Sequence, residues 1–507
     1  MISTVPTVGG GIIADELPQE LPDGAWSDGN NVRFRDGYAQ RITGHVPSLT
    51  TPAAAAYHVA NYPIAAANWW IHATLTNTYA HNGTTQSTIT GVGQTGTASD
   101  RFTSCVLGGV YAQNNQVDVP KYWGGTSSMV NLTGWNSGWR CKSLRAFKVY
   151  FLALNVTKSG TNYGSMVKWS HAADPGTIPS SWDETDPTLD AGEQDLAETP
   201  DSIVDGLPLG DSFVIYKQRS MYAVQFIGGN DIFRFSRLPG DHGMLAQNCA
   251  ANTPLGHVVL TASDVVVHNG TEPQSLLTKR MRRWLFNQID GSNFGLSFLT
   301  ANHAQNEVWI CFPTSGASSC NRALIWNYVD NTFAVRDLPN ATAGAFGPLS
   351  VNASNRWNDD TESWNEDTTT WDQSDISQAD KRVLLASTAP GLYLVDQSNR
   401  FAGTTYTSSL ERLGMSFGTA STVKTLRAVF PRIDAPSGTS VTIQAGASMD
   451  AETGYVWSPP VTYTVGSTYR VDTFATGRFI GLRVSSSSSG SWRIKSMDFD
   501  FVQRGTY

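Results

Sequence analysis

The densest group of residues that could do chemistry in this chain is basic. Lys279, Arg280, Arg282 and Arg283 place four cations within five residues of a chain whose formal net charge is -8. Clustered cations can neutralise phosphates or meet acidic groups of another subunit. The apolar residues of 275–289 follow a helical spacing, which predicts an amphipathic helix. The four cations are candidates for contact with DNA in a channel or with a subunit; the alternative is a solvated outer helix face.

A second group combines aromatic and acidic residues between 356 and 375. Trp357, Trp364 and Trp371 are spaced seven residues apart, with Asp and Glu residues among them. The Thr, Asn and Asp content disfavours a coiled coil. Carboxylates could hold Ca²⁺, but the glycine and terminal glutamate of an EF-hand loop are missing. We expect an extended insertion anchored by stacked tryptophans, with a calcium or glycan site as the alternatives.

The stretch ASMDAETGYVWSP loosely matches the Ser-x-Asp-x-Gly-x-Thr-Trp turn of sialidase-type propeller enzymes. The matching positions are Ser448, Asp450, Gly454 and Trp457. In those enzymes the turn is structural, and no catalytic set of arginines, tyrosine and carboxylates can be assigned here from spacing. A glycosidase therefore remains the weakest of the functional alternatives.

Other signatures of chemistry are missing from the sequence. It has no HExxH or GxxxxGK[ST] pattern, and its nine histidines are scattered. His81 and His268 each precede Asn-Gly in a similar hairpin, so we expect them to be hydrogen-bonded structural residues. We expect no catalytic residues, no metal and no cofactor, and hence a protein that is not an enzyme.

The five cysteines form neither a CxxC pair nor a Cys/His cluster. A zinc site and a disulfide framework are therefore not indicated. We expect buried, reduced thiols, with one optional bridge between Cys311 and Cys320 if they face each other across a hairpin.

Composition favours strands and turns over helices. Charged residues make up only 15% of the chain, and Gly, Ser, Thr and Asn are abundant. The acidic balance argues against a broadly basic nucleic-acid surface. No apolar window of about 18 residues occurs, so no membrane-spanning segment is expected.

Alternating strands joined by short turns recur six times and predict an all-β fold. Spacings of 45 to 77 residues fit four-stranded blades with insertions, so we expect a six-bladed β-propeller over 61–420. The alternative is an array of β-sandwiches without ring closure. The hairpins begin near Trp70, Phe147, Phe213, Val258, Val308 and Val383.

The two ends of the chain differ from this repeat. Residues 1–60 are expected to form an N-terminal arm and the first strands. Residues 421–507 alternate through Ser- and Gly-rich turns, which predicts an additional β-sandwich-like module. Its last strand, 492–502, could complete a sheet begun elsewhere, so this module is an alternative means of closing the propeller.

Residues 16–45, ELPQELPDGAWSDGNNVRFRDGYAQRITGH, resemble the opening of tail proteins from short-tailed bacteriophages. Weaker echoes occur at 168–183, 211–229 and 477–484. The family is the tail nozzle, also called packaged-DNA-stabilisation or tail-plug, proteins. The positions that match its pattern are Trp26, Asn31, Val32, Arg33, Gly37, Arg41 and Gly44.

This resemblance implies a virion protein, made in the host cytoplasm, that forms a propeller-based homohexamer below the adaptor ring. It implies a distal nozzle that retains packaged DNA and forms the ejection channel. Its partners would be further copies of itself, adaptor or portal-side ring proteins and transiently DNA, with tail fibres or a needle as further possible partners. The alternative is a receptor- or carbohydrate-binding adhesin, which is usually trimeric.

Overall fold

The computed structural model describes residues 2–5, 8–64, 67–229, 231–348 and 381–506. Nearly all of their regular structure is β-strand, and α1 (Arg282–Gln288) is the single α-helix of these ranges. Short 3-10 turns lie at η1 (Pro18–Glu20), η2 (Phe294–Leu296) and η3 (His303–Gln305). The predicted all-β class is confirmed, and the strands form many small antiparallel sheets.

Six sheets, here called the consecutive sheets, follow one another along the chain, and five of them have four strands each. The first two comprise β6 (His58–Ile64), β7 (Ala67–Ala73), β8 (Thr78–His81) and β9 (Gln86–Thr88), then β10 (Thr103–Leu107), β11 (Val110–Asn114), β12 (Lys121–Trp123) and β13 (Val130–Asn131). The third comprises β14 (Trp139–Phe147), β15 (Tyr150–Lys158), β16 (Thr161–Trp169) and β17 (Gly192–Asp195). The fourth and fifth comprise β18 (Ile203–Leu209), β19 (Ser212–Lys217), β20 (Met221–Phe226) and β21 (Phe233–Arg237), then β22 (Ala250–Thr253), β23 (Gly256–Leu260), β24 (Val265–His268) and β25 (Gln274–Ser275).

The sixth consecutive sheet has seven strands, and its last one comes from the N-terminal part of the chain. It runs through β26 (Phe298–Asn302), β27 (Glu307–Phe312), β28 (Cys320–Asn327), β29 (Thr332–Pro348), β30 (Lys381–Ser387) and β31 (Gly391–Val395). The strand β5 (His45–Pro47) then pairs with β31, with Leu394 opposite Val46. The strand β5, which precedes all six consecutive sheets in the sequence, therefore completes the last of them.

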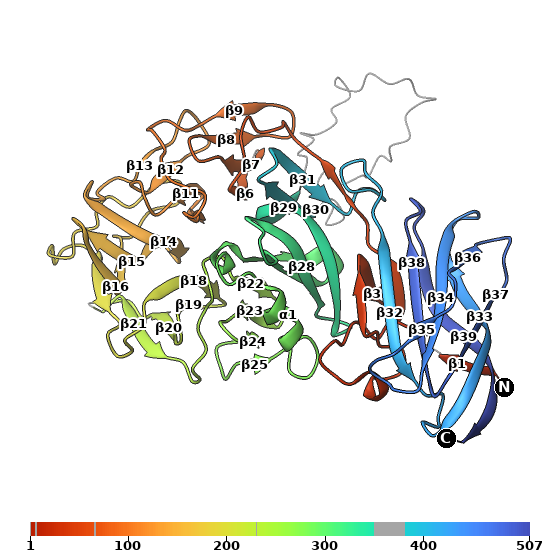
Figure 1. Cartoon of the computed structure of the whole chain (residues 1–507). Helices are drawn as coiled ribbons and strands as arrows, with labels where there is room; N and C mark the ends of the chain where they lie inside the picture. The colour runs from red at the N-terminus through yellow and green to blue at the C-terminus, as the bar shows by residue number, and fades with distance from the viewer. Residues whose placement is uncertain (1, 6–7, 65–66, 230, 349–380, 507) are drawn as a thin grey trace, which may run out of the picture.

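The consecutive sheets are arranged around a common centre (Figure 1). Their first strands meet there, because β10 contacts both β6 and β14, β14 contacts β18, and β22 contacts β26. The sixth sheet returns to the first through contacts of β29 with β6. Central strands such as β23 are buried along their whole length, as expected for small sheets covered on both faces by neighbours.

The six predicted hairpins do not correspond one to one with the six sheets. The hairpins that begin near Val308 and Val383 both lie in the seven-stranded sheet, joined by the 17-residue strand β29. The sheet β10–β13 was missed, because only β11 of its strands is buried throughout. One sheet was thus counted twice and another overlooked.

Two six-stranded sheets, here called the paired sheets, are built from both ends of the chain, and both termini lie there (Figure 1). One contains β1 (Ile2–Val5), β3 (Val32–Arg35), β4 (Tyr38–Arg41), β33 (Thr422–Asp434), β37 (Val471–Gly477) and β39 (Arg493–Thr506). The other contains β2 (Asp28–Asn30), β32 (Ser408–Met415), β34 (Ser440–Ser448), β35 (Val456–Trp457), β36 (Val461–Thr464) and β38 (Phe479–Ser486). Their inner faces share one core that includes Val429, Ile443 and Leu482.

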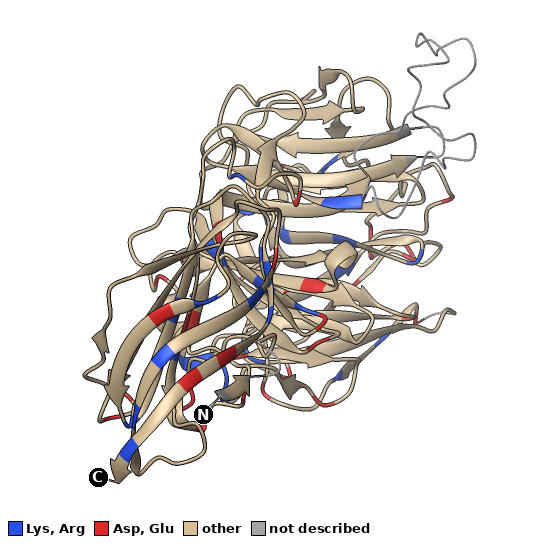
Figure 2. Cartoon of the chain, turned by 90° about the vertical axis from the view of Figure 1, so that its right-hand side faces the viewer, with Lys and Arg blue, Asp and Glu red and all other residues tan. Residues whose placement is uncertain are grey.

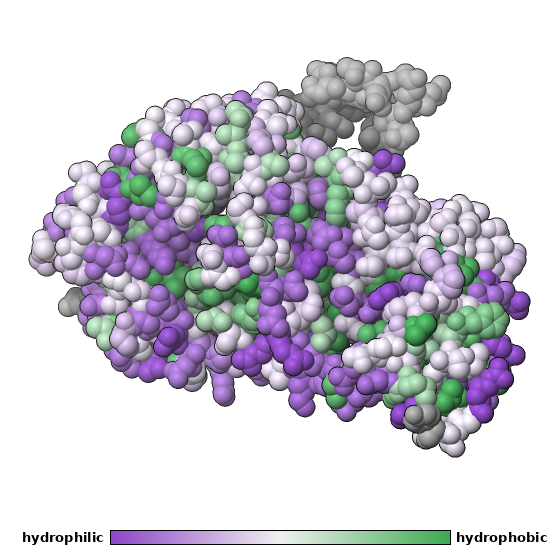
Figure 3. Space-filling model, viewed as in Figure 1, coloured by the Kyte–Doolittle hydropathy of each residue, from purple (hydrophilic) through white to green (hydrophobic). Residues whose placement is uncertain are grey.

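The last strand of the chain does complete a sheet begun elsewhere. β39 pairs with β33 along most of its length and also with β1 and β4 from the N-terminal region. Opposite charges pair across β33 and β39, at Arg427 with Asp500 and at Arg432 with Asp498. Figure 2 shows basic and acidic residues on neighbouring strands close to the two termini. Hydrophilic residues cover much of the face seen in Figure 3, with hydrophobic ones in smaller groups.

Candidate functional site

The basic segment forms a shorter helix than its spacing predicted. The expected helix covered 275–289, whereas α1 begins at Arg282 and ends at Gln288. Ser275 still belongs to β25, and Lys279 has a φ of 61°, a left-handed conformation that ends regular helix. The apolar residues of the segment are nevertheless inward-facing, because Leu277, Met281 and Leu285 are all fully buried.

The four candidate cations have different surroundings. Arg280 donates to the backbone oxygen of Asn331 at 2.9 Å, and Nε of Arg282 donates to the backbone oxygen of Ser263 at 2.7 Å. Lys279 and Arg283 are exposed, and their side chains have no hydrogen-bond or ion-pair partner among the described residues. Two of the four cations are therefore free to meet another molecule.

Arg33, in the N-terminal segment (residues 16–45), belongs to a buried ionic cluster beside the sixth consecutive sheet. Nε of Arg33 lies 2.5 Å from Oε1 of Glu307, and its Nη2 lies 3.0 Å from Oδ2 of Asp396. Arg336, fully buried, lies 3.6 Å from the same Asp396 and stacks over the ring of Trp309 at 4.6 Å. The cluster holds β3, β27, β29 and the end of β31 together.

The electrostatics of this cluster favour the charged forms of Arg33 and Asp396. Burial alone would lower the pKa of Arg33, but the charges of Asp396 and Glu307 raise it above its ordinary value. Burial alone would raise the pKa of Asp396, but Arg33 and Arg336 hold it below its usual range. Such a cluster joins elements rigidly, because removing one member leaves an unpaired buried charge.

The positions that carry the tail-protein resemblance lie at this junction. Trp26 donates to the backbone oxygen of Val8 at 2.8 Å. Asn31, in a left-handed conformation, donates to Asp337 and accepts from the backbone nitrogen of Asp337. Arg41 donates to the backbone oxygen of Tyr406 at 3.1 Å and stacks over its ring. These contacts hold the N-terminal segment between the sixth consecutive sheet and the paired sheets.

Sequence reasoning missed a polar hub where the consecutive sheets meet. Nη2 of Arg145 lies 2.6 Å from Oδ2 of Asp205, and it also donates to Oδ1 of Asn248 at 2.9 Å. Asn248 in turn donates to Asp205 through its backbone and to the backbone oxygen of Phe102 through its side chain. These residues are far apart in sequence, and none has a local pattern that could reveal the hub.

The two histidines of the repeated hairpins are hydrogen-bonded structural residues, as predicted. Nδ1 of each accepts from the backbone nitrogen two residues ahead, at 2.9 Å for His81 and 3.3 Å for His268. The hydroxyl of Tyr216 lies 2.7 Å from Nε2 of His268 and 2.6 Å from Nδ1 of His257. Burial lowers the pKa of His268 to about 4, so this network is neutral at pH 7.

The turn that resembles the sialidase element is a local hydrogen-bonded loop between β34 and β35. The hydroxyl of Ser448 donates to the backbone oxygen of Thr453 and accepts from the backbone nitrogen of Asp450. Oδ1 of Asp450 accepts from the backbone nitrogen of Glu452, and Gly454 has a φ of 71°. Each polar group that defines the turn is used within it.

All five cysteines are free thiols, and four of them are buried. The optional bridge is not formed, because Cys311 lies opposite Ala323 in the sheet and Cys320 lies opposite Ala341. Burial raises the pKa of the Cys105 and Cys249 thiols to about 12.

Three further observations concern ligands and membranes. The tryptophan and aspartate segment 356–375, with its predicted stacking and its calcium and glycan alternatives, lies outside the described residues. Within the described ranges, no group of three or more His, Cys, Asp or Glu is placed to hold a metal ion. No helix in the same ranges has the length and apolar character needed to cross a membrane.

Comparisons with known proteins give no family. No family model matches the chain, and no curated protein matches it. Among solved structures, a computationally designed protein called Ika8 is similar over 70% of this chain and 100% of its own length. The TM-score of that match is 0.37 and the sequence identity is 11%.

Proposed function

We propose that this protein is a non-enzymatic structural subunit of a virus particle, the tail nozzle of a short-tailed bacteriophage. The observation that carries the proposal is the location of the residues behind the resemblance. Trp26, Asn31, Arg33 and Arg41 hold the N-terminal segment between two large β-structures. Such a framework suits a subunit that must transmit and resist force as part of a ring.

The consecutive sheets are, in this proposal, the blades of a six-bladed propeller. Three features support ring closure: the sheets surround a common centre, β29 returns to β6, and β5 supplies the last strand of the sixth sheet. Strand exchange between the two ends of a ring protects its edges and resists opening. Removing β5 should therefore lower the temperature at which all six sheets unfold.

The exposed cations Lys279 and Arg283 are the proposed contact with a neighbouring subunit or with DNA. Mass photometry of the purified chain, alone and mixed with tail-less particles of its phage, tests the assembly. We expect six copies, free or on the particle, and loss of assembly in Lys279→Glu/Arg283→Glu.

The matched control is Arg219→Glu, which reverses another exposed cation on the turn between β19 and β20. This variant should assemble as the parent does. A trimer that binds host cells would contradict the nozzle and favour the adhesin. Folded, protease-resistant monomers that never join particles would contradict both the nozzle and the adhesin.

A further inference from the structure

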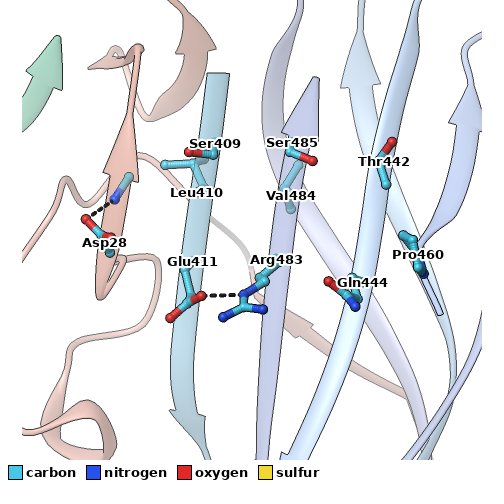
Figure 4. A pocket seen from close by; sticks show the side chains of 11 residues that line it. Asp28, Ser409, Leu410, Glu411, Thr442, Gln444, Pro460, Arg483, Val484 and Ser485 are labelled. Atoms are coloured by element: carbon cyan, nitrogen blue, oxygen red, sulfur yellow. Dashed lines mark hydrogen bonds and ion pairs between the residues drawn. The ribbon is translucent and has the colours of Figure 1, made fainter. Parts of the chain in front are cut away.

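The outward face of the paired sheet β2–β32–β38–β34 carries a groove of about 270 Å³ (Figure 4). Its walls come from four neighbouring strands and from Pro460, which follows β35. No part of the proposed assembly uses this groove, and no residue of it belongs to the basic segment. Its side chains are mainly polar, although the strands around it are packed on a buried apolar core.

Strand register places the polar side chains in two parallel rows. In the first row, Asp28 lies opposite Glu411, Glu411 opposite Arg483, and Arg483 opposite Gln444. A carboxylate, a second carboxylate, a guanidinium and an amide thus follow one another across four strands. All four are planar groups with two or more hydrogen-bonding positions.

The second row presents hydroxyl groups beside these planar groups. Ser409 lies opposite Ser485, and Ser485 lies opposite Thr442. Figure 4 shows both rows on the same side of the sheet. The side-chain hydroxyls of these three residues make no hydrogen bond to any other described residue. They can therefore donate to and accept from a bound molecule.

The centre of the groove is held rigidly. Nε of Arg483 lies 2.5 Å from Oε2 of Glu411, and its guanidinium lies 3.8 Å from the centre of the Trp457 ring. Trp457 lies flat over Gly446, where a β-carbon would come within 2.7 Å of the ring. Groups fixed before binding lose little conformational entropy when a ligand arrives.

Several hydrogen-bonding positions remain open in this fixed arrangement. Arg483 uses Nε for Glu411, which leaves its two terminal nitrogens as donors. Gln444 donates to the backbone oxygen of Ser458 at 2.8 Å, which leaves its oxygen as an acceptor. A ligand with many hydroxyl groups would satisfy donors and acceptors alternately along the row.

The charges of the row indicate which class of polyol would bind. Arg483 is already paired with Glu411, so the lining of the groove contains two carboxylates and one cation, and Arg322, outside the lining, only partly offsets the charge of Asp28. The pKa of Asp28 is raised, mainly through partial desolvation of its carboxyl group and further through the charge of Glu411. A phosphate, sulfate or carboxylate ligand would meet repulsion there.

We propose that this groove binds a neutral oligosaccharide, whose hydroxyl groups pair with the two polar rows. The proposed binding site is separate from the residues of the nozzle assembly and does not depend on that assembly. Binding should be measured on the purified full-length protein with an array of neutral and acidic oligosaccharides. Isothermal titration of the neutral saccharides that give signals should then follow.

We expect binding to neutral members of the array and at least about a tenfold loss of affinity in Gln444→Ala and in Asp28→Asn. Asp472→Asn, at an exposed position on β37 of the other paired sheet and outside the groove, is the matched control and should bind as the parent does. The Asp28→Asn substitution preserves the shape of the side chain, so its binding result can be interpreted even if the Gln444→Ala variant does not fold. No neutral binding, binding to acidic saccharides alone, or undiminished binding by Asp28→Asn would overturn the proposal.

Discussion

Nε of Arg33 lies 2.5 Å from Oε1 of Glu307, and the two side chains are only 3% and 0% exposed. The pair joins β3, a strand of the paired sheets, to β27 in the sixth consecutive sheet. Both side chains are shielded from water, so Glu307 depends on Arg33, and Arg33 depends on Glu307 and Asp396. The pair therefore links two residues that are 274 positions apart in the sequence.

Replacing Arg33 with methionine should lower the free energy of unfolding by about 3–5 kcal/mol, because Glu307 and Asp396 would be left with uncompensated charge. Urea unfolding followed by tryptophan fluorescence measures the change. Arg35→Met is the matched control: its side chain is 38% exposed, pairs with the exposed Asp36 and donates to Gln305, so the expected loss is below about 1 kcal/mol. Equal losses in the two variants would contradict the assigned role of the cluster.

Acid should destabilise the protein before its carboxylates titrate. Burial lowers the pKa of His45 and His58 to about 3, and of His72 and His268 to about 4. Unfolding returns each to a pKa of about 6.5, so the unfolded chain takes up more protons below that pH. The contribution of these histidines to the free energy of unfolding is therefore fully present above about pH 6.5. It falls as the pH drops toward their pKa values in the folded protein.

Thermal melts between pH 7.5 and 5 measure this loss, on the order of 1–2 kcal/mol for each buried histidine at pH 5. His268→Gln should flatten the dependence, because it removes one titrating group from the network with Tyr216. A melting temperature independent of pH over this range would refute the prediction.

Gly44 should not tolerate a side chain. A β-carbon at this position would lie 2.0 Å from the backbone oxygen of Arg400, and neither backbone can move without disturbing β5. We expect Gly44→Ala to cost about 1–3 kcal/mol through overpacking. Gly93→Ala is the control, since its β-carbon would meet no atom within 4 Å. Differential scanning calorimetry of both variants checks the difference.

The thiols should resist modification in the native protein. Burial raises the pKa of the Cys105 and Cys249 thiols to about 12, and it also raises the pKa of the Cys141, Cys311 and Cys320 thiols above the ordinary value. Because the thiolate is the reactive form, iodoacetamide at pH 8 should label the folded chain slowly and all five cysteines after denaturation. Mass spectrometry counts the labels. Rapid labelling of Cys311 in folded protein, or a disulfide that includes it, would be inconsistent with the structure.

Local pattern was sufficient for strands and for short turns. The alternation around Val258 predicted a buried hairpin, and His268 before Asn-Gly predicted a hydrogen-bonded histidine; both are found. Pattern failed where long-range pairing decides the outcome. The predicted helix over 275–289 was longer than α1, because Lys279 adopts a left-handed conformation. The hairpins at Val308 and Val383 were predicted as separate units, but β29 joins them in one sheet.

By itself, the sequence determined the all-β class, the reduced state expected of the cysteines and most hairpins, because these depend on residue type and on spacing of two to ten residues. Only the tertiary structure brought Arg33 to Glu307, Arg145 to Asp205 and Glu411 to Arg483. Their separations in sequence are 274, 60 and 72 residues. Contacts between residues so far apart in sequence follow from how whole sheets pack. That packing depends on the whole chain, and no local spacing encodes it.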